Sequence, residues 1–264
     1  KTILNIMSKE RPLILVSNDD GISAPGIRHL IRLMKKLGDV FVVAPNSPQS
    51  GMSHAITLES MLFSERVHIE GLGVTEYACS GTPVDCVKLA MNKFLARKPD
   101  LCVSGINHGA NSSVNVLYSG TMAAAIEGAI AGVPSIGFSL LDYSQDADFY
   151  QSEDHVLRIA RHVLESGLPS GICLNVNIPK LSREQIKGVK VCRQSDGHWE
   201  EDFDERMNPM GKTYYWLTGK FYNHDEGKDT DIWALENGYI SVVPVKFDVT
   251  AHDHIQQLNF LNHE

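Results

Sequence analysis

Two adjacent aspartates, Asp19 and Asp20, are the residues of this 264-residue chain whose type and spacing most directly suggest chemistry. They follow an apolar run over 13–17 that has the length of a short buried strand. Two charges this close repel by roughly 1 kcal/mol in water and about 4 kcal/mol at a protein surface. A divalent cation such as Mg²⁺ or Mn²⁺, which prefers hard oxygen ligands, would compensate for this repulsion. An ordinary Asp-Asp-Gly turn or helix cap is the alternative explanation.

Neutral oxygen donors recur in the loops after two further predicted strands. Ser50 lies in a polar loop after the strand predicted over 39–44, and Asn107 follows the apolar run 101–104. Two neutral donors beside two carboxylates would leave a divalent cation near neutrality and still able to polarise a phosphate. Because each residue alone is typical of an ordinary loop, the hypothesis depends on all four donors meeting in space.

A second candidate is a phosphate-binding helix start. The segments 104–111 and 118–125 bracket a loop rich in Asn, Gly and Ser, which leads into a helix of small residues that we expect Thr121 to cap. Free backbone N–H groups there, with the hydroxyls of Ser119 and Thr121, could hold a phosphate with help from the helix dipole. An ordinary Ser/Thr cap explains the same residues without a ligand.

Histidines and aromatic residues add weaker candidates. His54 and His108 lie beside the proposed ligands, and histidine exchanges protons near neutral pH, which would suit either for protonating a leaving alkoxide. A surface or hydrogen-bonded structural role is the more common explanation for each of them. Aromatic residues between 199 and 233 could stack on a base, although a core or oligomer contact is their more common role.

The elements that must position these residues alternate along the chain. Short apolar strands are predicted over 13–17, 39–44, 101–104, 135–140 and 172–178. Helices are predicted over about 27–37, 83–95, from Thr121 onward and over 153–166. This alternation predicts an α/β fold with a Rossmann-like, doubly wound and mostly parallel sheet. Such sheets bind ligands beyond the carboxyl ends of their strands, where the polar clusters fall.

We expect two parts in the chain. Residues 1–180 would form the Rossmann-like core with the metal site, and residues 56–79 within it are predicted to form a β-ribbon. Residues 181–264 would form a C-terminal extension of hairpins, a strand over 239–245 and a short final helix. Part of this extension is expected to return to the core.

Charge and cysteine content limit the classes of partner. With 24 basic and 32 acidic residues the net charge is -8, which disfavours a nucleic-acid polymer. No apolar run approaches the roughly 20 residues that cross a bilayer, and the first ten residues lack a signal-peptide stretch. The five cysteines are scattered and indicate neither a disulfide framework nor a zinc site. We therefore expect a cytoplasmic protein that binds no membrane.

Several motifs, taken in order, resemble the SurE family of stationary-phase survival proteins with 5′-nucleotidase activity. The resemblance runs from about Leu13 to the C-terminus, and although each motif is weak alone, their order is highly specific. The motifs are Ser-Asn-Asp-Asp-Gly at 17–21, Ala-Pro-Gly at 24–26, Val-Val-Ala-Pro at 42–45, Ser-Gly at 50–51, Gly-Thr-Pro-Val-Asp-Cys-Val at 81–87, Val-Ser-Gly-Ile-Asn at 103–107 with Gly109 and Asn111, Tyr-Ser-Gly-Thr at 118–121, and Thr-Ala-His at 250–252.

The resemblance implies a site, a substrate and an assembly. The implied ligands of one Mn²⁺ or Mg²⁺ ion per subunit are Asp19, Asp20, Ser50 and Asn107. The implied phosphate contacts are Asn107, Gly109, Asn111, Ser119, Gly120 and Thr121. Family members hydrolyse nucleoside 5′-monophosphates, and some also accept 3′-nucleotides or short polyphosphate. The resemblance further implies a homodimer or homotetramer in which the C-terminal hairpin region is exchanged between subunits.

These residues suggest a catalytic scheme with one open step. We expect Asp19, Asp20 and Asn107 to carry catalysis, and a water activated by the metal and Asp19 to attack the phosphorus in line. Direct attack by an aspartate is the alternative that the residues leave open.

Two other protein classes share parts of this pattern. A non-enzymatic, phosphate-responsive receiver domain also places two acids after its first strand, but it needs an acceptor aspartate where this chain has Asn107. A dinucleotide-binding oxidoreductase would need Gly-x-Gly-x-x-Gly after that strand, and the carboxylates there would repel a pyrophosphate.

Overall fold

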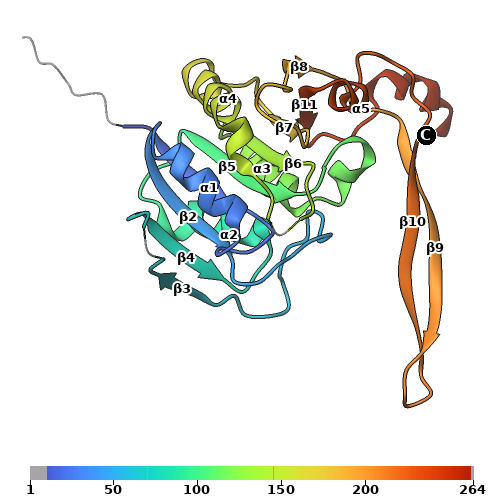
Figure 1. Cartoon of the computed structure of the whole chain (residues 1–264), viewed down its shortest axis with the longest axis horizontal. Coiled ribbons are helices and arrows are strands. Elements are labelled where there is room, and N and C mark those ends of the chain that lie inside the picture. The colour runs from blue at the N-terminus through green and yellow to red at the C-terminus, as the bar shows by residue number, and fades with distance from the viewer. Residues whose placement is uncertain (1–10, 70, 145, 263–264) are drawn as a thin grey trace, which may run out of the picture.

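A twisted nine-stranded sheet forms the centre of the protein (Figure 1). The structure is a computed structural model that describes residues 11–262 except 70 and 145. The strands of this sheet are β1 (Leu13–Ser17), β2 (Asp39–Pro45), β3 (Ser64–Val67), β4 (Thr75–Cys79), β5 (Leu101–His108), β6 (Ser135–Leu140), β7 (Ile172–Ile178), β8 (Gly188–Val191) and β11 (Tyr239–Lys246). Their spatial order is β3-β4-β2-β1-β5-β6-β7-β11-β8. Neighbours from β4 through β7 pair in parallel, which confirms the predicted α/β class.

Helices cover both faces of the sheet because the strands are apolar on both sides. The helices are α1 (Pro25–Met34), α2 (Pro83–Leu89), α3 (Gly120–Ile130), α4 (Glu153–Ser166) and α5 (Asp231–Glu236). Side chains alternate along a strand, so Ile14 and Val16 of β1 pack in one core cluster with α1 and α4. Leu15 points to the opposite face, into a cluster with residues of α2 and α3. This burial on both faces explains the continuous apolar runs in the sequence.

The chain reverses its direction of travel across the sheet next to β1. From β1 it moves to β2 and then β4 on one side, and it returns to β5 on the other side of β1. Ser17 at the end of β1 is in register with Ser104 of β5. The crevice beyond the carboxyl ends of β1 and β5 is therefore the topological switch point, where open α/β sheets bind ligands.

Three local predictions differ from the structure. The predicted ribbon is shorter, since β3 and β4 pair antiparallel but residues 56–63 form no strand, and β4 joins the main sheet beside β2. The third core strand does not end at 104 but continues to His108 after an irregularity between 104 and 107. The N-cap of α3 is Ser119 and not Thr121, because the Ser119 hydroxyl accepts the Met122 N–H.

The C-terminal region divides between the sheet and a projecting hairpin. Strand β11 inserts between β7 and β8 and pairs antiparallel with β7. Strands β9 (Gly197–Met207) and β10 (Thr213–Asn223) form a separate long hairpin that extends away from the core (Figure 1). The chain ends in two short 3₁₀ helices, His252–His254 and Gln256–Leu261.

Two further findings bear on the expected environment. None of the helices within the described part of the chain is long and apolar enough to span a membrane. All five cysteines are free and buried.

Candidate active site

The predicted site residues converge at the switch point between β1 and β5. Asp19 and Asp20 follow β1, and Asn107 lies near the end of β5. The loop after β2 joins them because the Gln49 N–H donates to the Asp19 carbonyl oxygen at 2.7 Å. This bond places the adjacent Ser50 beside the carboxylates.

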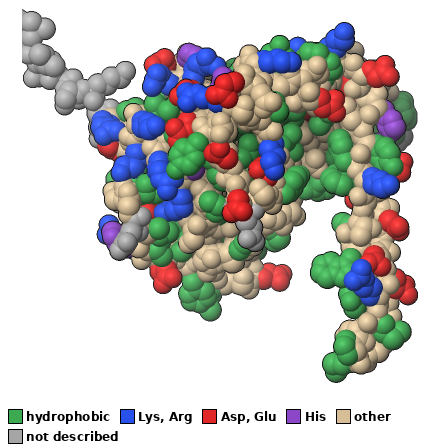
Figure 2. Space-filling model, viewed as in Figure 1, with side chains coloured by type: hydrophobic (Ala, Val, Ile, Leu, Met, Phe, Trp, Pro, Cys, Tyr) green, Lys and Arg blue, Asp and Glu red, His purple; other side chains and the backbone are tan. Residues whose placement is uncertain are grey.

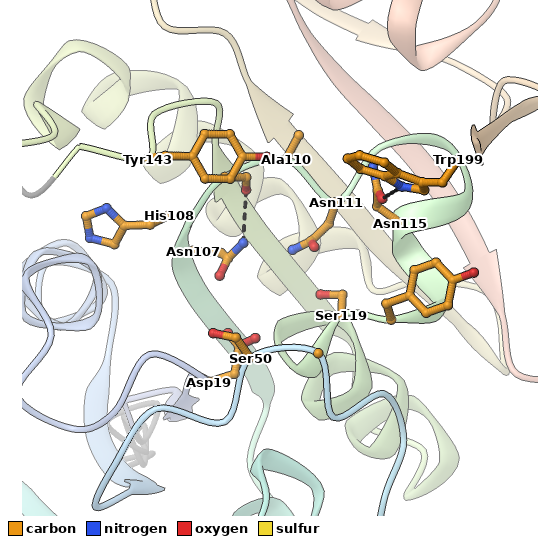
Figure 3. Close-up of a pocket in the computed structure, with 13 residues that line it drawn as sticks. Asp19, Ser50, Asn107, His108, Ala110, Asn111, Asn115, Ser119, Tyr143 and Trp199 are labelled. Carbon is orange, nitrogen blue, oxygen red and sulfur yellow. Dashed lines mark hydrogen bonds between the residues drawn. The ribbon is translucent and has the colours of Figure 1, made fainter. Parts of the chain in front are cut away.

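A pocket of about 180 Å³ opens at this convergence. Its walls are formed by Asp19, Ser50, Gly51, Asn107, His108, Gly109, Ala110, Asn111, Asn115, Tyr118, Ser119, Tyr143 and Trp199. Figure 3 shows Asp19 and Ser50 on one side of the pocket, Asn107 facing them, and the rings of Tyr143 and Trp199 on the far side. Three of the four predicted metal ligands therefore line one pocket.

Asp19 is a buried carboxylate with an unusual proton affinity. Its side chain is 4% exposed, and one of its oxygens accepts a hydrogen bond from the Thr121 hydroxyl. Burial raises the pKa of Asp19 to about 6, the Thr121 hydroxyl opposes this shift, and the charge of Asp20 adds to it. In the absence of a cation the protein therefore holds this carboxylate at a free-energy cost.

Asp20 connects the ends of β1 and β5. Its Oδ2 accepts the backbone N–H of His108 at 3.3 Å. Burial raises the pKa of Asp20, and this hydrogen bond lowers it in part. Asp20 is the predicted metal ligand that does not line the pocket, although it is held against the residue that follows Asn107.

Helix α3 approaches Asp19 so closely that its first residue must be small. A Cβ atom on Gly120 would lie 2.8 Å from Asp19 Cβ and 2.9 Å from Asp19 Oδ2. Glycine at this position therefore allows the helix N-terminus to reach the carboxylate. The positive end of the helix dipole stabilises negative charge at this point.

The amide of Asn107 is oriented by its own strand. Its Nδ2 donates to the Gly109 carbonyl oxygen at 2.9 Å, and Figure 3 shows the amide oxygen on the side that faces Asp19 and Ser50. The side chain therefore offers the pocket an acceptor, which is the group that binds a cation.

The donor set fits a hard divalent cation. Among the described residues, no lysine or arginine forms an ion pair with Asp19 or Asp20, so nothing in that part of the protein balances their charge. The same residues contain no cluster of three or more His, Cys, Asp or Glu, so a cation here would rest on two carboxylates and neutral oxygens. Such a mixed oxygen set is typical of Mg²⁺ or Mn²⁺ sites that keep several waters.

The predicted phosphate contacts fall into two groups. Asn107, Gly109, Asn111 and Ser119 line the pocket, whereas Gly120 and Thr121 lie behind it and support Asp19. Gly109 has a φ of 102°, and a Cβ atom there would collide with the ring of Tyr143.

Asn111 is held rigidly at the pocket wall. Its Nδ2 donates to Ser139 Oγ, and its backbone N–H donates to Asn177 Oδ1, both at 2.8 Å. These neighbours on β6 and β7 fix the direction of the Asn111 side chain.

The two candidate histidines occupy different places. His108 lines the pocket, and its ring packs edge-on against Phe149. His54 instead contacts Glu127 of α3, with 3.0 Å between His54 Nε2 and Glu127 Oε2, and lines a separate groove.

Six pocket residues were not singled out from the sequence as site residues. They are Gly51, Ala110, Asn115, Tyr118, Tyr143 and Trp199. Tyr118 directly precedes the predicted phosphate contact Ser119, so proximity in the sequence was a usable signal for it. Trp199 comes from β9 and is the first of the aromatic residues between 199 and 233 for which the sequence suggested base stacking as the less common role.

Comparisons with known proteins agree along nearly the whole chain. A family model described as Survival protein SurE matches residues 14–201. The "5′-nucleotidase SurE" of Christiangramia forsetii is 65% identical over 254 residues, which cover 96% of this chain and 98% of that protein. The "5′-nucleotidase SurE" of Phocaeicola vulgatus is 49% identical and covers 98% of this chain and 100% of that protein. The crystal structure of the SurE protein from Aquifex aeolicus matches with a TM-score of 0.81 and 38% identity, over 95% of this chain and 99% of that one. The chain belongs to the SurE family.

Proposed function

We propose that this protein is a 5′-nucleotidase, a metal-dependent phosphomonoesterase that hydrolyses nucleoside 5′-monophosphates to nucleoside and phosphate. The observation that carries the proposal is the pair of a buried Asp19 and a partly buried Asp20 at the sheet's switch point, beside a pocket without lysine or arginine in its wall. The relatives named above carry this activity in their names over nearly full length, which supports the same substrate class.

The proposed cation ligands are Asp19, Asp20, Ser50 and Asn107, and the cation is Mn²⁺ or Mg²⁺. When bound, the cation supplies charge neutralisation for the phosphoryl group and lowers the pKa of a water. Because no lysine or arginine lines the pocket, a doubly charged phosphate depends on that neutralisation.

The chain's own residues would orient the phosphate and move a proton. Asp19, fixed by the Thr121 hydroxyl, accepts the proton of the attacking water. The start of α3 at Ser119 and the positive-φ turn at Gly109 border the space for the phosphate oxygens. Asn107 and Asn111 present amide groups from the opposite wall, which holds the phosphorus in line for attack.

A receiver-like switch is the alternative function, and the site argues against it. In that class an aspartate at the end of a central strand accepts the phosphoryl group, and here Asn107 of β5 stands at that position, followed by His108 on the pocket wall. An amide is a poor nucleophile at phosphorus, so turnover is the better explanation of the site.

Phosphate release from AMP tests the proposal. We expect release with Mn²⁺ or Mg²⁺, none with EDTA, and recovery when the metal is restored. Asp19→Asn should reduce kcat by at least about 10²-fold, while Asp253→Asn, an exposed aspartate of the C-terminal segment, should leave it unchanged. EDTA-resistant turnover, or normal turnover by the Asp19 variant, would refute the assignment.

We also propose that residues 181–264 act as an extension for contacts in a homodimer or homotetramer, with exchange of the hairpin region. Figure 2 shows hydrophobic side chains on the projecting hairpin, and Phe203, Met207 and Met210 are 59%, 68% and 82% exposed. Exposed apolar side chains on an arm without a core of its own are typical of an interface. Light scattering after size exclusion should show a smaller assembly for Met207→Asp than for the wild type.

We also propose that the protein is located in the cytoplasm. The five buried free thiols suit a reducing compartment.

A further inference from the structure

A second chamber adjoins the proposed phosphate pocket. It has a volume of about 580 Å³, compared with about 180 Å³ for the first. The two chambers share Gly51, Asn115, Tyr118 and Trp199, so a ligand in one can extend into the other. Ligand pockets typically measure about 300–1,000 Å³, and the second chamber lies in that range whereas the phosphate pocket alone does not.

Trp199 is held at the junction of the chambers with much of its surface open. Its Nε1 donates to Asn115 Oδ1 at 2.8 Å, and Phe221 packs against it at an interplanar angle of 66°. The side chain is nevertheless 40% exposed, and Tyr118 at the same junction is 51% exposed. A ring fixed by two contacts and open to the chamber is ready to stack on a flat ligand.

The base of the hairpin is anchored in a way that fixes Trp199 relative to the core. Ser113, the first residue of the 3₁₀ helix Ser113–Leu117 before α3, accepts the Gly197 N–H through its hydroxyl at 3.1 Å and donates to the Ser195 carbonyl oxygen at 2.9 Å. The buried Asp231 accepts the backbone N–H groups of Ser113 and Ser195 at 2.8 and 3.0 Å.

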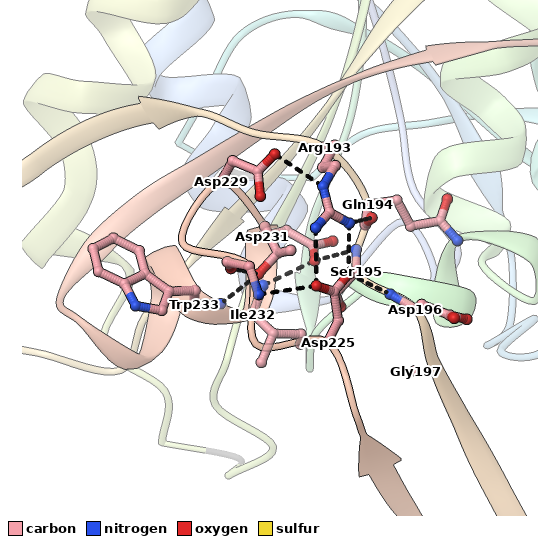
Figure 4. Close-up of polar contacts among 12 residues, drawn as sticks. Arg193, Gln194, Ser195, Asp196, Gly197, Asp225, Asp229, Asp231, Ile232 and Trp233 are labelled. Carbon is pink, nitrogen blue, oxygen red and sulfur yellow. Dashed lines mark hydrogen bonds and ion pairs between the residues drawn. The ribbon is translucent and has the colours of Figure 1, made fainter.

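An ion-pair cluster closes this anchor on its outer side. Arg193 contacts Asp225 through two guanidinium nitrogens and Asp229 through its Nε, as Figure 4 shows. The two hairpin strands therefore leave the core from a cross-linked base, and Trp199 lies two residues beyond Gly197 at that base.

The chemistry of the second chamber favours a neutral aromatic ligand. Its wall contains Gly51, Asn115, Tyr118, Trp199, Glu201, Leu217, Thr218 and Gly219. Because this wall carries one carboxylate and no lysine or arginine, further phosphate groups would be repelled there. Glu201 can accept hydrogen bonds from sugar hydroxyls or base amines, and the Thr218 hydroxyl can accept or donate them.

We propose that this chamber is the nucleoside subsite and that the base of the substrate stacks on Trp199, with Tyr118 beside it. The inference rests on the proposed function, since it takes the phosphate of the same ligand to lie in the first pocket. It assigns substrate selection to the hairpin and cation binding to the sheet.

Steady-state kinetics with AMP and with ribose 5-phosphate test this subsite. The second substrate keeps the phosphate and sugar but lacks the base. We expect Trp199→Ala to lower kcat/KM for AMP by about tenfold or more, mainly through KM, and to change kcat/KM for ribose 5-phosphate by less than about twofold. Trp199→Phe, which keeps a flat ring, should remain within about threefold of the wild type for AMP.

A matched control lies on the same hairpin. Trp216 of β10 is 60% exposed and lines neither chamber. Trp216→Ala should therefore leave kcat/KM unchanged for both AMP and ribose 5-phosphate. An equal loss of kcat/KM for AMP and ribose 5-phosphate in Trp199→Ala would indicate a merely structural role and overturn the proposal. Unchanged AMP kinetics in that variant would also overturn it.

Binding of adenosine gives a readout that does not depend on catalysis. We expect adenosine to quench the tryptophan fluorescence of the wild type, and this quenching to disappear in Trp199→Ala and persist in Trp216→Ala. Quenching that is the same in all three proteins would refute the subsite. If the wild type released phosphate from neither substrate, the proposed function would fail, while adenosine quenching would still decide whether the subsite exists.

Discussion

Replacing Asp19 by asparagine should stabilise the metal-free protein while it removes catalysis. Without a cation, burial raises the pKa of Asp19 from 3.8 to about 6. This shift is about 2 pH units, and each unit corresponds to about 1.4 kcal/mol, so the charged carboxylate costs the folded state about 3 kcal/mol. Asparagine has the same shape, keeps an oxygen to accept the Thr121 hydroxyl and carries no charge.

The sign of the pH dependence follows from the direction of the shift. The folded protein binds the Asp19 proton more tightly than the unfolded chain does, so this group lowers stability as pH rises from about 4 to about 6. Above that range its unfavourable contribution is constant. The asparagine variant lacks this group, and we expect it to be about 3 kcal/mol more stable than the wild type at pH 7.5.

Urea unfolding in EDTA measures the effect, with circular dichroism as the signal and one protein concentration throughout. We expect the difference between variant and wild type to grow from near zero at pH 4 to about 3 kcal/mol at pH 7.5. With Mn²⁺ the difference should shrink, because the cation binds the folded wild type and stabilises it by mass action.

The exposed Asp253→Asn variant controls for the loss of one negative charge at the surface. Parallel pH profiles of stability for the Asp19 variant and the wild type in EDTA would contradict this prediction. Equal stabilisation of both proteins by Mn²⁺ would also contradict it.

Three further substitutions probe the supports of the site. Gly120→Ala should force the start of α3 away from Asp19, reduce kcat/KM by about 10²-fold and, because the added Cβ atom meets buried atoms, cost about 1–3 kcal/mol of stability, as kinetics and urea unfolding would show. Glu127→Ala should cost about 1–3 kcal/mol at pH 7, because His54 and a lysine lose their buried partner. These partners lower the pKa of Glu127, so its contribution is lost as pH falls through that pKa, and urea unfolding at pH 4 should show a smaller difference. Thr82→Ala removes the capping box of α2 and should cost about 1 kcal/mol by the same measurement.

The division of labour between sheet and hairpin follows from their different rigidity. The two carboxylates directly follow β1 and Asn107 lies on β5, and these buried parallel strands hold a cation site to a narrow geometry. Trp199 stands on an arm whose base is cross-linked but whose length is exposed.

The sequence by itself determined the sheet and the meeting of its strand ends. Apolar runs alternating with amphipathic helices require a parallel sheet covered on both faces, and parallel strands present their carboxyl ends on one edge. Asp19, Asp20 and Asn107 each follow or end such a run, so their approach was predictable without coordinates.

Tertiary structure alone decided which neighbour each polar group satisfies. Local propensity allows either Ser119 or Thr121 to cap α3, and the choice depends on Asp19, which lies 102 positions earlier and takes the Thr121 hydroxyl. The length of β5 likewise depends on its pairing with β6 up to His108. Trp199 reaches the pocket through contacts between segments about 80 residues apart in the sequence. No local pattern in the chain encodes such contacts, because they depend on how the hairpin docks on a core that must form first.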